Sequence, residues 1–243
     1  MKILRRIVRF LDRLTDAGLL VFFLLLFSMG LYALYDSALV YMDANDTSLL
    51  KYKPGYEKEE PEKEIEGNMA AWITLDDTDI DYPVMQGDDN SEYLNKDPYG
   101  EYSLSGSIFL DSRNASDFSD SYSLIYGHHM EHGAMFGALD DFLDKDYFNA
   151  HRTGTLYVGD DVYRIQVFGV LECAATQEEI FAPTEIPLED TAGYIAQKAL
   201  YLDEKTWDKD RKILALSTCK YPDTADRTVV LTTIEKENSH EKQ

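Results

Sequence analysis

A cysteine and an arginine lie close together in the sequence near the C-terminus, separated by a short polar segment. The stretch LSTCKYPDTADRTVV, residues 216–230, places Cys219 at the end of one β-branched run and Arg227 at the start of the next. If the two runs pair as antiparallel strands, both residues lie at the same edge of a sheet. A guanidinium stabilises a nearby thiolate, which is one requirement of a reactive cysteine. Taken alone, a buried structural cysteine and a surface arginine are the more common alternative.

A histidine pair supplies a possible proton-transfer group. The stretch SLIYGHHMEHGAMFGAL, residues 123–139, predicts a strand that ends at Gly127 with His128 directly after it. Histidine has an ordinary pKa near 6.5, so His128 could exchange a proton with a thiol. Because unperturbed thiols and imidazoles are mostly neutral at pH 7, we expect a slow enzyme whose nucleophile is activated by its surroundings.

Two metal sites are suggested by spacing and fail on a required residue. His128 and His132 are four residues apart, but a zinc-binding H-E-x-x-H helix needs Glu where His129 stands. The acidic run 76–81 has calcium-loop spacing, but an EF-hand needs glycine where Tyr82 stands. We expect no metal at the catalytic site. We interpret the acidic run as a solvated turn, and a calcium site of a different geometry is the alternative.

Composition narrows the class of protein. The chain has 243 residues, enough for one globular domain with accessories, and a formal net charge of -22, which argues against a nucleic-acid partner. Its two cysteines, Cys173 and Cys219, are too few for a disulfide scaffold and lack zinc-site spacing. A single disulfide between them is compatible with the sequence, although the apolar surroundings of Cys173 favour packing in a strand.

The N-terminus predicts a membrane anchor. Residues 1–16 are basic, and residues 17–36 begin with a long uncharged apolar run. About 20 apolar residues cross the hydrocarbon core of a bilayer, and a cleaved signal peptide would have a shorter run. The basic flank is expected to stay in the cytoplasm, so the rest of the chain is expected outside the cell on a single-pass anchor. A buried core helix is the alternative.

Three further segments follow the anchor. Residues 37–66 are rich in Glu, Lys, Asp and Pro and predict an acidic stalk, in which TSLLKY is a possible helical fragment. Residues 67–237 form the predicted globular domain, and residues 238–243 are a polar tail. The domain contains short apolar runs bounded by turn residues, which predict a mainly β sandwich or barrel. The runs are 70–75, 81–86, 106–111, 123–127, 153–158, 162–173, 212–219 and 227–234.

Two stretches interrupt this pattern with helical spacing of apolar residues. They are residues 134–144 and residues 190–204, and both predict helical insertions in the β domain.

Together these features resemble the sortase family, specifically class B. The resemblance covers roughly residues 67–236. It rests on YGHHM, LSTC and DRTVV, which are histidine, cysteine and arginine motifs in the order, and on the strands, that this family has. IDYPVMQGDDNSEYLN and GSIFLDSRN also resemble class B sequences. The resemblance implies an eight-stranded sortase β-barrel with helical insertions, a cysteine transpeptidase of the thiol protease type, and no cofactor.

The resemblance also implies roles for individual residues. Cys219 would attack the Thr carbonyl of a C-terminal sorting signal and form a thioester. His128 would act as general acid and base, and Arg227 would stabilise the oxyanion or the substrate carbonyl. Less specific family patterns imply substrate contacts from six further residues: Asn90, Leu94, Thr176, Ile180, Ser217 and Thr218.

The partners implied by the resemblance are surface proteins that carry a C-terminal sorting signal, and an amine acceptor. The acceptor is a peptidoglycan precursor amine in wall anchoring, or a pilin lysine in a class B pilin polymerase. The compact loop after Cys219, KYPDTAD, resembles some pilin-polymerising members and keeps both alternatives open. An inactive surface-binding module with the same barrel is the alternative outside the enzymes.

Overall fold

The computed structural model describes residues 2–44, 47–56, 65, 69–207, 211–219 and 226–237, and for Cys219 the description is of the backbone. The chain divides into two compact units, Met1–Met42 and Asp43–Gln243. The first consists of most of helix α1 (Lys2–Ala44). Within α1, Arg5–Met42 is long and apolar enough to cross a membrane, judged by length and composition.

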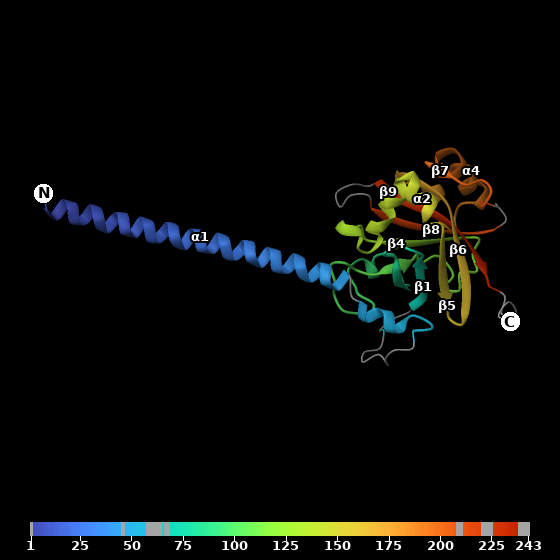
Figure 1. Ribbon diagram of the computed structural model, residues 1–243, viewed down its shortest axis with the longest axis horizontal. Coiled ribbons are helices and arrows are strands. Elements are labelled where there is room, and N and C mark those ends of the chain that lie inside the picture. Colours follow the sequence, from blue (N-terminus) through green and yellow to red (C-terminus); the bar gives the residue numbers. More distant parts are fainter. Residues whose placement is uncertain are drawn as a thin grey trace. The chain divides into compact units, whose positions relative to one another are not determined.

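The second unit is built on a closed β-barrel of eight strands (Figure 1). The strands follow one another around the ring in the order β5-β1-β2-β3-β4-β8-β9-β6, and β6 pairs with β5 to close it. The short β7 (Tyr201–Leu202) adds to β6 outside the ring. The barrel strands are β1 (Met69–Leu75), β2 (Asp81–Met85), β3 (Ile108–Leu110), β4 (Tyr122–Gly127), β5 (Thr153–Val158), β6 (Asp161–Ala174), β8 (Lys212–Cys219) and β9 (Asp226–Lys236).

Each of the eight predicted apolar runs coincides with one strand of the barrel, so the predicted fold class is confirmed. The run that forms β8 is apolar on both faces for a physical reason. Leu214 and Leu216 belong to the barrel interior, whereas Ile213 and Ala215 belong to a second core on the outer face. Successive side chains of a strand point to opposite faces, so a strand covered on both sides is a continuous apolar run.

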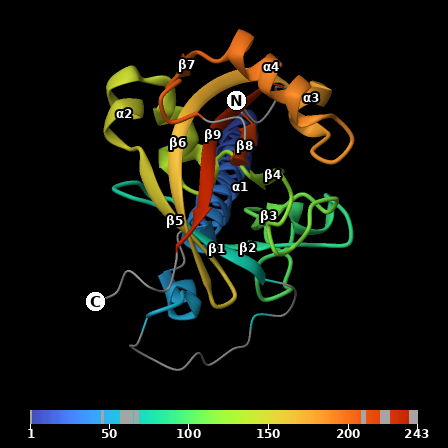
Figure 2. The same ribbon diagram turned by 90° about the vertical axis from the view of Figure 1, so that its right-hand side faces the viewer.

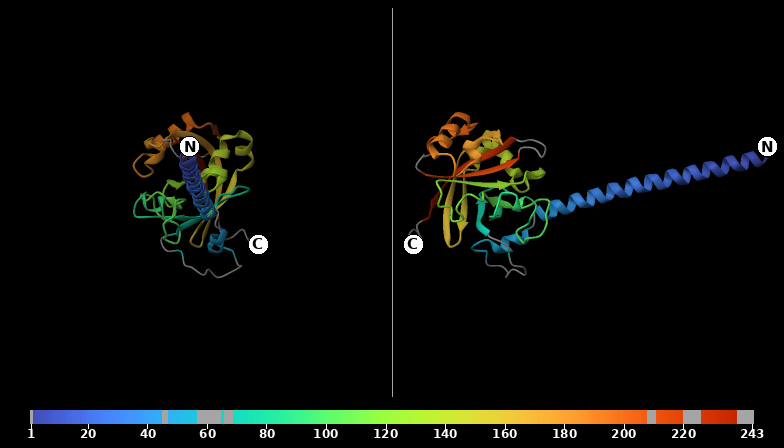
Figure 3. Two further views of the ribbon diagram at one scale, coloured as in Figure 1. Left: turned by 90° about the vertical axis from the view of Figure 1, so that its left-hand side faces the viewer. Right: turned by 180° about the vertical axis from the view of Figure 1, so that it is seen from behind.

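The outer core is covered by the insertion between β6 and β7. This insertion contains α3 (Glu178–Phe181) and α4 (Leu188–Lys198), and it lies along one side of the barrel in Figure 2 and Figure 3. Ile180 and Ile195 pack there with strand residues such as Val229. The predicted helix over 190–204 therefore exists as α4, but it ends earlier because the chain extends at Ala199 into β7.

The other predicted helix, over 134–144, is a 3-10 helix. This element, η4 (Phe136–Leu143), buries Phe136, Leu139 and Phe142 in the barrel interior. A spacing of three residues matches the three residues per turn of a 3-10 helix, which explains why one face of η4 is apolar. Helix α2 (Lys145–Ala150) follows, with the Asp144 carboxylate capping its first turn.

The segment before the barrel differs from the expected stalk. Helix α1 extends beyond residue 36 to Ala44, and Thr47–Tyr52 forms the 3-10 helix η1. Just after η1, Lys53 forms an ion pair of 2.8 Å with Asp81 of β2. The segment TSLLKY contains apolar residues that can pack against the barrel unit, whereas the residues that follow it are mostly acidic. Most of that acidic remainder, the loop after Cys219 and the polar tail lie outside the described residues.

Candidate active site

Three strand ends bring the cysteine, histidine and arginine of the sequence motifs to one edge of the barrel. Strands β4 and β8 are parallel, with Gly127 opposite Thr218, so His128 and Cys219 follow at the same end of neighbouring strands. Strand β9 runs antiparallel to β8, and its Arg227 is the register partner of Cys219. The chain therefore carries a thiol, an imidazole and a guanidinium on three adjacent strands.

The charge of Arg227 reaches two residues of the outer face. Burial raises the pKa of Tyr126, the nearby Asp111 raises it further, and Arg227 acts in the opposite direction. Arg227 is also the register partner of Cys173 on β6. Burial and the charge of Asp226 raise the pKa of the Cys173 thiol to about 12, again against Arg227. The guanidinium thus lies within electrostatic reach of the outer face.

The two cysteines are not partners in a disulfide. Cys173 is a free, buried cysteine. Cys173 and Cys219 lie on β6 and β8, and Arg227 of β9 lies between them in register. Two strand spacings separate their Cα atoms by about 9.6 Å. A disulfide requires a Cα separation below about 7 Å. The disulfide that the sequence left open is therefore incompatible with this sheet order.

The tautomer of His128 follows from its hydrogen bond. The half-buried ring places Nε2 2.6 Å from the backbone oxygen of Leu94, at the end of η2 (Glu92–Leu94). A carbonyl oxygen only accepts hydrogen bonds, so Nε2 carries a proton. This leaves Nδ1 as the ring nitrogen that can take up or release a proton in exchange with another group.

A buried carboxylate connects the outer face to the α3–α4 insertion. Asp111 is fully buried and accepts hydrogen bonds from Asn90, Arg113 and Tyr126. Burial alone would raise the pKa of Asp111, but the Arg113 hydrogen bonds outweigh it and the pKa is lowered. Arg113 also donates to the backbone oxygen of Phe181 at 2.6 Å and pairs with Glu185 at 2.9 Å.

Comparison with known proteins decides the family. Residues 73–235 match the sortase domain. The chain belongs to the sortase family. It is 38% identical over 162 residues to Sortase B of Listeria monocytogenes, covering 65% of each chain, slightly less than two thirds. It is 31% identical over 180 residues to Sortase B of Staphylococcus aureus, covering 72% of this chain and 73% of that one.

A comparison with solved structures also supports the sortase family. Spy0129 of Streptococcus pyogenes, a class B sortase involved in pilus biogenesis, is 39% identical with a TM-score of 0.62, covering 68% of this chain and 91% of that one. The predicted class B sortase resemblance is thereby confirmed. Because sortases are cysteine transpeptidases, the predicted enzyme class follows from the family.

The six further residues predicted from sortase patterns occupy different environments. Leu94 is 39% exposed and holds His128 through its backbone, and Thr176 is exposed before α3. The Asn90 side chain donates a hydrogen bond to Asp111 and accepts one from the backbone N–H of Ser112. The other three are fully buried, and their substrate contacts stay a prediction: Ile180, Ser217 and Thr218.

The zinc alternative lacks its helix in this sortase. His128 follows a strand, and His132 lies in η3 (Glu131–Gly133) with a left-handed φ of 60°, so the two do not share a helix face. Within the described part of the chain, no group of three or more His, Cys, Asp or Glu side chains gathers to hold a metal ion.

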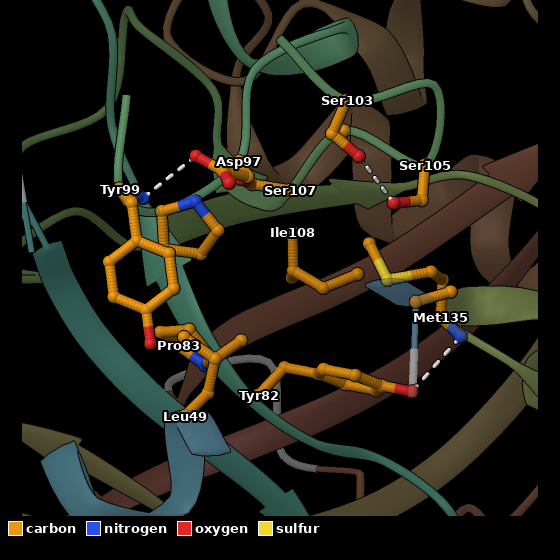
Figure 4. Close-up of a pocket in the computed structure, with 13 residues that line it drawn as sticks. Leu49, Tyr82, Pro83, Asp97, Tyr99, Ser103, Ser105, Ser107, Ile108 and Met135 are labelled. Atoms are coloured by element: carbon orange, nitrogen blue, oxygen red, sulfur yellow. Dashed lines mark hydrogen bonds between the residues drawn. The ribbon is translucent and has the colours of Figure 1, made fainter. Parts of the chain in front are cut away.

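A pocket of about 70 Å³ lies close to the segment that carries His128, because its lining residue Met135 pairs with His129 (Figure 4). Tyr82, Ile108 and Met135 line it together with serines of the 103–107 loop. The Tyr82 hydroxyl accepts a hydrogen bond from the Met135 backbone N–H at 3.0 Å. Of the predicted site residues whose side chains are described, none lines this pocket.

Proposed function

We propose that the protein is a membrane-anchored transpeptidase in which Cys219 is the nucleophile, His128 the general acid and base, and Arg227 the oxyanion-stabilising group. The convergence of β4, β8 and β9 at one edge carries this proposal, because it brings the three positions together from distant parts of the sequence. The sortase match over residues 73–235 supports the chemistry.

The first half-reaction forms a thioester. The Cys219 thiolate attacks the carbonyl carbon of the threonine in the sorting signal, and Arg227 stabilises the oxyanion that develops on the carbonyl oxygen. The C–N bond then breaks, and the departing amine takes a proton from His128. The surface protein is left attached to sulfur through its threonine carbonyl.

The second half-reaction transfers the protein. An acceptor amine attacks the thioester carbon and loses a proton to His128. The C–S bond breaks, a new amide forms, and Cys219 returns as the thiolate. No net oxidation or reduction occurs, so the proposed cycle needs no redox cofactor.

The proposed location is the outer side of a cell membrane. The apolar span Arg5–Met42 supports a single-pass anchor. Its basic N-terminal residues support an orientation with the N-terminus in the cytoplasm. The proposed acceptor is a cell-wall peptidoglycan amine.

Pilin polymerisation is a second candidate, in which the acceptor is a lysine amine of another pilin subunit. The 39% identity to Spy0129, a class B sortase involved in pilus biogenesis, favours this alternative. The two candidates share the thioester and differ only in the amine.

Mass spectrometry of the full chain with a library of sorting-signal peptides tests the proposal. We expect a thioester adduct on the wild-type protein and none on Cys219→Ala, with the same melting temperature for both. Arg227→Lys should reduce thioester formation by about a hundredfold, because lysine lacks the guanidinium fork and oxyanion donors are worth a few kcal/mol. Offering peptidoglycan amines or a pilin lysine peptide to the trapped thioester then separates the two acceptors.

Normal peptide turnover by Cys219→Ala would remove that residue as nucleophile. Near-normal rates in Arg227→Lys would remove the arginine from the site. A wild-type protein that binds the peptides without forming any adduct would favour the inactive surface-binding module.

A further inference from the structure

Two of the proposed catalytic residues are each adjacent in sequence to a buried threonine. Arg227 precedes Thr228, and Cys219 follows Thr218, and both threonines are fully buried. Thr228 and Val230 are two residues apart on β9, and Val230 belongs to the barrel interior. Strand alternation therefore directs Thr228 into the barrel, on the face opposite to Arg227.

Asp140 of η4 lies beneath this edge and binds two of the neighbouring residues. One carboxylate oxygen, Oδ1, accepts a hydrogen bond of 2.7 Å from the Thr228 hydroxyl. The other, Oδ2, lies 3.1 Å from Nε2 of His129, the residue after His128. One carboxylate thus connects the start of β9 to the segment that follows β4.

The bridge spans strands that are not hydrogen-bonded to each other. Strand β8 lies between β4 and β9, so the shortest connection between them by backbone pairing runs through β8. Asp140 is fixed from below, because η4 buries Leu139 and Phe142 in the barrel core. Hydrogen bonds to a carboxylate are roughly twice as strong as neutral ones, so this connection is stiff.

The His129 ring depends on this contact for its orientation. Its side chain is mostly buried, and Nδ1 is a buried atom that has no hydrogen-bond partner among the described atoms. The contact with Asp140 is therefore the polar interaction that orients the ring. The backbone of His129 also pairs with Met135, so the ring and the chain beside His128 are held together.

We propose that Asp140 is a positioning residue that sets the spacing between His128 and Arg227 through His129 and Thr228. The inference rests on the proposed transpeptidase function, and it concerns residues that touch neither substrate nor the reacting atoms. Loss of the bridge should lower the rate of thioester formation while leaving substrate affinity unchanged, because the outer face keeps its residues.

Three threonine variants of the full chain in detergent test this role. Thr228→Val removes the hydroxyl but keeps the shape, and Thr228→Ser restores a hydroxyl. Thr153→Val is the matched control, because it removes another threonine-to-aspartate hydrogen bond, to Asp76 on a different part of the barrel. We expect kcat for thioester formation to fall about tenfold in Thr228→Val with KM unchanged, equivalent to about 1.4 kcal/mol. Thr228→Ser and Thr153→Val should remain within about twofold of wild type.

Histidine NMR signals provide a readout that needs no substrate. The imidazole signals of His128 should shift in Thr228→Val and return to their wild-type positions in Thr228→Ser. If the wild type forms no thioester, the proposed function fails, and these signals alone decide the positioning role. Unchanged kcat and unchanged His128 signals in a folded Thr228→Val protein would overturn it, as would an equal effect of Thr153→Val.

Discussion

Cys173 and Arg227 are register partners on β6 and β9, yet the thiol of Cys173 is held in its neutral form. Burial removes the water that a thiolate needs, and the Asp226 charge opposes a second negative charge, which raises the pKa to about 12. Since the thiolate is the reactive form, a cysteine with this pKa is inert at neutral pH.

We therefore expect iodoacetamide at pH 8 to modify the native protein at Cys219 and to leave Cys173 intact. In Cys219→Ala the native protein should take up no label, and one label should appear after unfolding in guanidinium. Peptide mapping by mass spectrometry measures both. Modification of Cys173 in the folded protein at pH 8 would contradict the burial argument.

At the scale of elements, η4 packs closely against the segment before it because Gly137 has no side chain. A Cβ on Gly137 would overlap the backbone oxygen of Met130, and because both clashing groups belong to the backbone no side-chain movement relieves the clash. By contrast, a Cβ on Gly193 inside α4 would meet nothing within 4 Å.

Gly137→Ala should lower the free energy of unfolding by about 3 kcal/mol, the upper end for overpacking. Gly193→Ala is the matched control and should raise it by about 0.5–1 kcal/mol, because glycine is unfavourable inside a helix. Thermal or urea unfolding of the two variants measures the difference. Equal stabilities would show that the segment before η4 moves to accept the methyl group.

The α3–α4 insertion is tied to the barrel by Arg113, which links buried Asp111 to Phe181 and Glu185. Arg113→Gln should loosen the insertion, which carries Ile180, one of the residues predicted to contact the substrate. We expect the KM for a sorting-signal peptide to rise about tenfold with kcat little changed. A looser insertion weakens binding of the substrate in its ground state and in the transition state by the same amount.

Arg164→Gln is the control for that measurement. Arg164 pairs with Glu237 at 3.5 Å, and both side chains are largely exposed, so its loss should change neither constant. A fall in kcat without a change in KM for Arg113→Gln would place Arg113 in the chemistry instead of in substrate binding.

The sequence predicted elements whose signal is local. Alternating or continuous apolar runs predicted all eight barrel strands. The positions of the YGHHM, LSTC and DRTVV motifs at the ends of such runs predicted the three strand ends. It missed Asp140 and Asp111, because each gains its importance from partners far away in sequence: Thr228 for Asp140, and Asn90 and Tyr126 for Asp111. A single aspartate in an acidic chain carries no local signal of that kind.

At the scale of the whole molecule, the folded barrel unit includes residues that the sequence assigned to a stalk. Among the described residues, the buried apolar core begins at Ala44. The Lys53 ion pair with Asp81 adds a second attachment, and Asp81 also accepts hydrogen bonds from Trp72 and Thr74. Removing Lys53 would leave a partly buried carboxylate without its cation.

A protein of residues 43–243 should therefore fold without the preceding apolar helix and be more stable than one of residues 57–243. We expect the shorter protein to lose about 1–2 kcal/mol, or roughly 2–8 °C in melting temperature. Within the longer protein, Lys53→Met should reproduce part of this loss, whereas Lys51→Met should not. Equal melting temperatures for the two truncated proteins would mean that η1 contributes nothing to the fold.

The parallel pairing of β4 and β8 has a consequence for when the protein becomes active. Parallel neighbours cannot be joined by a tight turn, and here β5, β6, α3, α4 and β7 all intervene. The last two barrel strands supply two of the three proposed groups, so a partly synthesised chain holds an imidazole without its thiol. Such long-range pairing forms late in folding. A nascent chain is therefore chemically silent until its last strand is added, because the thiol gains its neighbours only once the C-terminal strand has closed the ring.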